Sequence, residues 1–125
     1  MTVPVAYFVM SALSVSLLQA DVTGVWSVEF KRDAHDYFST GTCTFKQNDR
    51  KLTGDCGSES MANVLSGEVN GQRVTWRFKS GFDGSIHAEF SGELDDEATT
   101  IRGGWHFVDS SDGATATGTF EARKR

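Results

Sequence analysis

Residues 64–79 read VLSGEVNGQRVTWRFK, two runs of alternating apolar and polar side chains on either side of Asn70-Gly71. A period of two is typical of a strand with one buried face, and Asn-Gly is a preferred pair for a two-residue hairpin turn. The segment therefore predicts a β-hairpin with Val74, Trp76 and Phe78 facing a core. The register predicted from this turn is a set of three inward pairs: Val69 with Gln72, Gly67 with Val74, and Leu65 with Trp76.

The same alternation runs from Asp21 to the end of the chain and predicts an all-β domain. We expect eight strands, at Val22–Lys31, Phe38–Gln47, Lys51–Gly57, Val64–Val69, Arg73–Lys79, Ser85–Leu94, Thr99–Val108 and Ala114–Arg123. Eight consecutive antiparallel strands are typical of an up-and-down β-barrel closed on itself.

Glycines support a closed and tightly curved sheet. Seven of them fall on inward positions, most opposite a bulky side chain that can fill the space above the glycine. The predicted pairs are Phe45 with Gly54, Phe90 with Gly103, Trp105 with Gly118, and Gly103 with Phe120.

The predicted connections differ in length between the two ends of the barrel. Those after the second, fourth and sixth strands are short, whereas those near residues 32–37, 58–63, 80–84 and 109–113 are mostly longer. In an up-and-down barrel all the odd connections lie at one end. A ligand would therefore enter at the long-loop end.

The first 20 residues carry no charge and are apolar from Val3 to Leu18, as in a secretory signal peptide cleaved after Ala20. An uncleaved membrane anchor and a buried N-terminal helix are the alternatives. We expect one barrel domain at 21–125, secreted or periplasmic, with no membrane contact after cleavage. The net charge is −5 without a basic stripe, which argues against a nucleic-acid partner.

Cys43 and Cys56 are predicted to face inward and directly opposite each other, within reach of a disulfide. Two cysteines in an exported chain favour a disulfide over a metal site; two reduced, buried thiols are the alternative.

Catalytic, metal and cofactor signatures are absent from the sequence, so we expect no enzyme, no metal and no cofactor. The predicted register places His87 and His106 opposite each other on the outer surface, and two histidines without a third ligand make a poor zinc site. His35 lies in the first long connection.

Four short motifs resemble the avidin and streptavidin family. This family belongs to the calycin superfamily, whose barrels also include the lipocalins. They are Val22-Thr23-Gly24-Val25-Trp26, Leu52-Thr53-Gly54, Val74-Thr75-Trp76-Arg77-Phe78 and Ile101-Arg102-Gly103-Gly104-Trp105. The resemblance implies the eight-stranded barrel and leaves Trp76 and Trp105 as candidate ligand contacts. Val28 replaces the family's first-strand Asn and Cys56 its third-strand Tyr. The polar groups that hold the biotin ureido ring are therefore mostly unmatched.

The chain also resembles the bacterial secreted metalloprotease inhibitors, which are exported eight-stranded barrels with one disulfide and an opening strand like Gly24-Val25-Trp26. That family inhibits through an N-terminal arm, and cleavage after Ala20 leaves almost none.

The sequence favours a barrel that binds a small, largely apolar ligand at its long-loop end. The alternative is a protein-interaction module, such as a secreted protease inhibitor, with a solid core. The tryptophans can fill the barrel or line a cavity. The candidate lining is Tyr37, Trp76, Phe78, Phe82, Trp105 and Phe107, with His35 or Asp109 at the rim.

Overall fold

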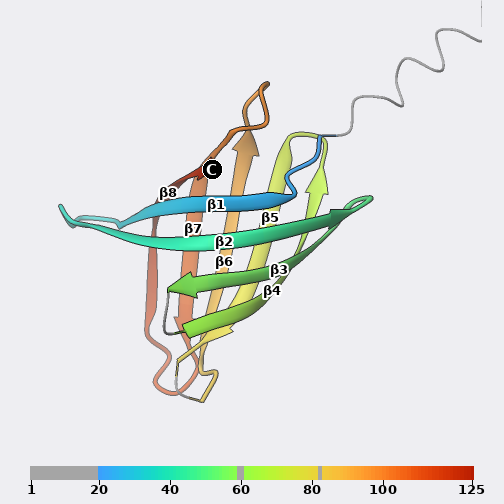
Figure 1. Ribbon diagram of the computed structural model, residues 1–125. Helices are drawn as coiled ribbons and strands as arrows, with labels where there is room; N and C mark the ends of the chain where they lie inside the picture. Colours follow the sequence, from blue (N-terminus) through green and yellow to red (C-terminus); the bar gives the residue numbers. More distant parts are fainter. Residues whose placement is uncertain (1–19, 59–60, 82) are drawn as a thin grey trace, which may run out of the picture.

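The chain forms a closed barrel of eight antiparallel strands (Figure 1). The computed structural model describes residues 20–58, 61–81 and 83–125. The strands are β1 (Gly24–Arg32), β2 (Phe38–Asn48), β3 (Lys51–Ser58), β4 (Met61–Asn70), β5 (Arg73–Ser80), β6 (Ile86–Leu94), β7 (Thr100–Asp109) and β8 (Thr115–Lys124). Each strand pairs with the next and β8 closes onto β1, so the predicted fold class is confirmed. In Figure 1, β1–β4 cross in front of β5–β8 at a steep angle.

The predicted strands match the observed ones within two residues at every end except the start of β4. This strand begins at Met61 rather than Val64, and Ser58 of β3 is the Cα partner of Met61. The long connection predicted at 58–63 is therefore wrong. The backbone pairing extends into a segment where apolar and polar residues do not alternate in the sequence. Asn63 therefore lies in a strand.

Two hairpins have the predicted register. Phe45 lies opposite Gly54 in β2–β3. In β7–β8, Trp105 lies opposite Gly118 and Gly103 opposite Phe120. At these pairs the bulky side chain and the facing glycine share one interior position, as expected.

The register predicted for β4–β5 is wrong. Val69 pairs with Val74, Gly67 with Trp76 and Leu65 with Phe78, so each partner is two residues further along than expected. The turn residues are Gly71 and Gln72, and Gly71 has φ 64°. Glycine thus occupies the first turn position, where a positive φ costs it little. A shift of two residues keeps every side chain on its predicted face.

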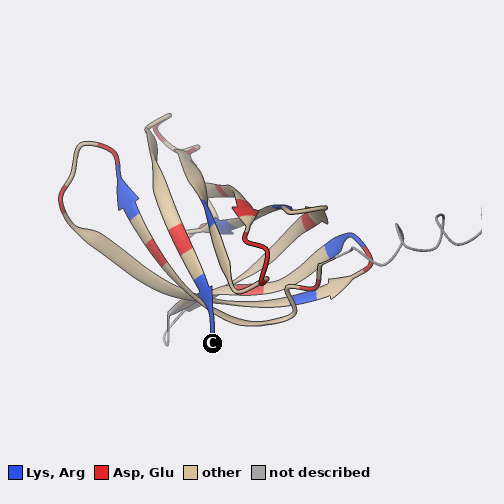
Figure 2. Ribbon diagram, turned by 90° about the horizontal axis from the view of Figure 1, so that it is seen from above, with Lys and Arg blue, Asp and Glu red and all other residues tan. Residues whose placement is uncertain are grey.

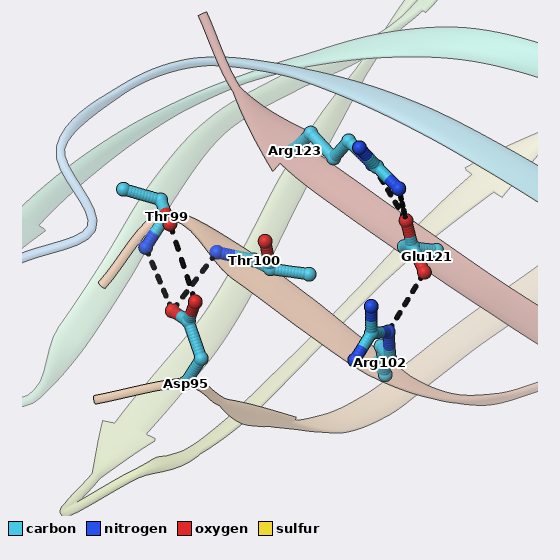
Figure 3. Close-up of polar contacts among 6 residues, drawn as sticks. All are labelled: Asp95, Thr99, Thr100, Arg102, Glu121 and Arg123. Carbon is cyan, nitrogen blue, oxygen red and sulfur yellow. Dashed lines mark hydrogen bonds and ion pairs between the residues drawn. The ribbon is translucent and has the colours of Figure 1, made fainter. Parts of the chain in front are cut away.

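The register predicted for β6–β7 is also wrong by two residues. Phe90 pairs with Trp105 rather than Gly103. Leu94 pairs with Ile101, so the segment between these partners is two residues longer than expected. Within it the Asp95 carboxylate accepts hydrogen bonds from the backbone N–H groups of Thr99 (2.8 Å) and Thr100 (3.0 Å) (Figure 3).

Large buried side chains fill the interior at the short-loop end. Its largest fully buried side chains include Trp26, Phe45, Trp76 and Leu52. Trp26 and Trp76 contact Phe45 at ring centroid distances of 6.1 and 5.0 Å. Within the described residues no polar or charged side chain is buried.

Charged residues of both signs are interspersed along the strands and turns, as Figure 2 shows. One cluster joins β7 to β8: Glu121 binds Arg102 (Nε to Oε2, 2.7 Å) and Arg123 (Nε to Oε1, 2.6 Å) (Figure 3). The described part of the chain holds no helix long and apolar enough to cross a membrane.

Gly118→Ala tests the close approach of Gly118 to the Trp105 ring and to the Lys31 backbone. An added Cβ would lie 2.5 Å from Trp105 Cζ2 and closer still to the Lys31 carbonyl oxygen. We expect a loss of about 1–3 kcal/mol in the free energy of unfolding, measured by urea denaturation. The matched control is Gly104→Ala on the outer face, where the nearest atom would be 3.4 Å away. Equal effects of the two substitutions would contradict this account.

Acid sensitivity is expected at the Asp95 turn. Hydrogen bonds from the Thr99 and Thr100 backbone lower the pKa of the Asp95 carboxyl. The Asp95 carboxyl therefore binds a proton less readily in the folded state than in the unfolded state. This contribution to stability is present above the ordinary Asp range, near pH ~4, and is lost as the pH falls through the folded pKa.

Asp95→Asn should accordingly make stability fall less steeply with acidification, measured as urea midpoints between about pH 7 and about pH 2.5. Glu97→Gln, at an exposed position of the same turn, should keep the wild-type pH dependence. An unchanged slope in Asp95→Asn would disprove the assignment.

Candidate functional site: an apolar cavity at the long-loop end

A cavity of about 280 Å³ opens at the end of the barrel that carries the connections after β1, β3, β5 and β7. We call it the long-loop cavity. Strands β1 to β7 all contribute to its lining, which is mainly apolar: Val28, Phe30, Thr40, Gly41, Thr42, Cys43, Cys56, Gly57, Asn63, Phe78, Ser80, Ile86, Ala88, Phe90 and Phe107.

The cavity arises from a change in side-chain size along the barrel axis. Phe45 on β2 and Phe90 on β6 fill the deeper layer. Towards the long loops the following inward positions are Cys43 and then Gly41 on β2, and Ala88 on β6. A Cβ on Gly41 would meet no atom closer than 3.6 Å. Small residues at this level leave the barrel unfilled.

Phenylalanine rings form one side of the cavity, and Phe90 is their centre. Phe78 stacks on Phe90 with centroids 6.0 Å apart and an interplanar angle of 21°. Phe30 and Phe107 meet Phe90 edge to face at 6.3 and 6.2 Å. Behind Phe90, Trp76 lies parallel to it at 5.0 Å. Phe30, Phe78, Phe90 and Phe107 are called the aromatic floor below.

The disulfide Cys43–Cys56 forms the opposite part of the lining. The two residues are Cα partners in β2–β3, 4.0 Å apart, and both side chains are buried. The predicted bridge is confirmed, and it indicates an oxidising compartment. Next to it on β4, Asn63 Nδ2 donates a hydrogen bond to the Cys56 carbonyl oxygen at 3.3 Å.

Of the residues predicted from the sequence, Phe78 and Phe107 belong to the lining described. Trp76 and Trp105 are buried next to the aromatic floor. Trp105 contacts Phe107 at 4.5 Å, and its Nε1 donates to the Thr119 carbonyl oxygen at 3.0 Å. Trp76 Nε1 is buried without a hydrogen-bond partner in the described structure.

Tyr37, predicted as a lining residue, and His35 and Asp109, predicted at the rim, are not among the lining residues described above. Tyr37 is 61% exposed and packs its ring against His35 at 5.6 Å, in the β1–β2 connection. The Asp109 carboxylate accepts hydrogen bonds from the Ser111 hydroxyl (2.6 Å) and backbone N–H (3.0 Å), which lower its pKa. Phe82 lies outside the described residues.

Sequence reasoning missed Asn63, Val28, Phe30 and Phe90 as lining residues. Alternation placed Val28, Phe30 and Phe90 inside but did not show how deep each lies. Asn63 fell in a segment expected to be a loop. Asn63 could have been predicted to face inward, because it lies two residues before the inward Leu65.

The two outer-surface histidines do not face each other as predicted. His87 is the Cα partner of Val108, and His106 that of Glu89, because β6–β7 is shifted by two residues. Among the described residues no group of three or more His, Cys, Asp or Glu side chains is placed to hold a metal ion.

Comparisons with known proteins identify the architecture. No family model matches the chain, and no curated protein matches it. A solved structure, that of EF1p2_mFAP2b bound to DFHBI, is similar with a TM-score of 0.59 and 17% identity. The match covers 83% of this chain and 94% of that one. At this identity the likeness shows a shared fold, and the avidin-like motifs stay a resemblance.

Removal of the disulfide should destabilise the barrel, because the bridge restricts the unfolded chain across a sequence separation of 13 residues. We expect Cys43→Ala/Cys56→Ala to lose about 2–4 kcal/mol of unfolding free energy, measured by urea denaturation. A reducing agent should lower the wild-type midpoint and leave that of the double variant unchanged. A wild-type midpoint insensitive to reduction would contradict this prediction.

Proposed function

We propose that this protein binds a small, largely apolar ligand in the long-loop cavity and catalyses no reaction. The observation that carries the proposal is an open, mainly apolar cavity above a core of large buried side chains. Its volume of about 280 Å³ is roughly twice that of the ~150 Å³ engineered cavity that holds benzene. Removal of apolar ligand surface from water would drive binding.

The similar fold of a barrel bound to DFHBI supports the proposal, because a barrel of this architecture can accommodate a small ligand. The lining determines which ligand fits, and it differs from protein to protein.

We further propose that residues 1–20 are a signal peptide and that the protein works outside the cytoplasm, secreted or periplasmic. The Cys43–Cys56 disulfide supports this location, because such bonds persist in oxidising compartments.

A protein-interaction role is the second candidate function. Tyr37, in the β1–β2 connection, and Phe38, at the start of β2, are 61% and 64% exposed, and such aromatic side chains are common in protein contacts. The open cavity favours ligand binding over the protein-interaction role, because that role predicts a solid barrel core.

Native mass spectrometry of the protein purified without detergent tests the ligand proposal. We expect retained mass that disappears on denaturation. Ala88→Leu places a larger side chain in the cavity and should abolish the retained mass, whereas Ala62→Leu, at an exposed position of β4, should keep it. A bare mass for the wild type, or retained mass in Ala88→Leu, would contradict binding in this cavity.

A further inference from the structure

We infer that the preferred ligand is a flat aromatic molecule with a hydrogen-bond donor, held between the aromatic floor and the carboxamide of Asn63. This inference rests on the proposed function and specifies its ligand. The juxtaposition that carries it is one half-buried amide in the lining of a cavity whose floor is made of phenyl rings.

Asn63 is the polar anchor. It lies on β4 as the Cα partner of Cys56, on the same face as the buried Leu65, and it belongs to the cavity lining. The Cys56 carbonyl oxygen can only accept a hydrogen bond, so it fixes the Asn63 NH2 group towards itself. The orientation leaves Oδ1 as an acceptor, and no hydrogen bond to Oδ1 occurs in the described structure. A ligand O–H or N–H would satisfy this acceptor.

The rest of the lining argues against a charged ligand. No charged side chain belongs to the lining in the part of the chain that the structure describes. A charge transferred from water to this site would lose its hydration without an ionic partner. The donor is therefore neutral, such as a phenol or a ring N–H.

The aromatic floor favours a planar ring over a saturated one. Phe30, Phe78 and Phe107 are each partly exposed and surround Phe90 in stacked and edge-to-face arrangements. An added aromatic ring can continue both geometries, and such pairs gain stability beyond their buried area. A cavity of about 280 Å³ has room for a fused two-ring molecule.

The donor is tested with 2-naphthol and 2-methylnaphthalene, which have similar shapes but differ in the hydroxyl group. Isothermal titration gives the affinity of each for the wild type and for Asn63→Leu, which keeps the side-chain size without the amide. We expect the affinity ratio of 2-naphthol to 2-methylnaphthalene to fall about five- to tenfold in Asn63→Leu. Asn48→Leu, at an exposed position of β2, is the matched control and should keep the ratio. An unchanged ratio in Asn63→Leu overturns the donor.

The aromatic preference is tested with decahydro-2-naphthol, the saturated counterpart of 2-naphthol. Phe78→Leu should lower the affinity ratio of 2-naphthol to decahydro-2-naphthol about threefold or more, because the leucine keeps an apolar contact but removes one ring. The wild type alone also tests the inference: tighter binding of decahydro-2-naphthol than of 2-naphthol overturns it, even if a variant fails to fold.

Different results would overturn the aromatic ligand and the proposed function of apolar-ligand binding. Binding of decahydro-2-naphthol without 2-naphthol overturns the aromatic ligand and leaves an apolar-ligand cavity in place. Absence of binding by all three probes overturns the inference, and a bare native mass for the wild type then overturns the proposed function as well.

Discussion

Closure of eight strands into one barrel is the constraint on which the rest of this structure depends. It removes both sheet edges and forces every second side chain into a shared interior of nearly fixed width. That interior must be filled layer by layer. Trp26, Phe45 and Trp76 fill it at the short-loop end, whereas Gly41 and Ala88 leave it open at the other. The candidate site is thus a consequence of side-chain size along the axis.

Polar side-chain interactions lie mainly outside the barrel, in turns and between neighbouring strands. The Asp95 carboxylate binds two backbone N–H groups and fixes the β6–β7 turn, while Glu121 links Arg102 on β7 to Arg123 on β8. Asn63 differs from these groups because it belongs to the lining of the interior cavity. In a mainly apolar lining, a half-buried amide can influence which ligand fits, since a polar group removed from water by a ligand requires a partner.

The fold is shared with a barrel of 17% identity, so this architecture tolerates extensive substitution. An alternating pattern of apolar and polar side chains, with glycines where the sheet bends, is compatible with many different sequences. The fold therefore says little about the ligand. The identity of the ligand depends on a few lining positions, above all the aromatic floor and the segment of β4 next to the disulfide.

The sequence by itself determined the eight strands, their faces and the Cys43–Cys56 pair, because a period of two is a local property of the chain. It also indicated which end is open. Only the tertiary structure decided the registers of β4–β5 and β6–β7, because a shift of two residues preserves every face and leaves no trace in the pattern. The depth of each inward residue likewise depends on the stagger of all eight strands. For this reason alternation predicted Phe78 and Phe107 as lining residues, but only the structure brought Phe90 and Asn63 to the cavity.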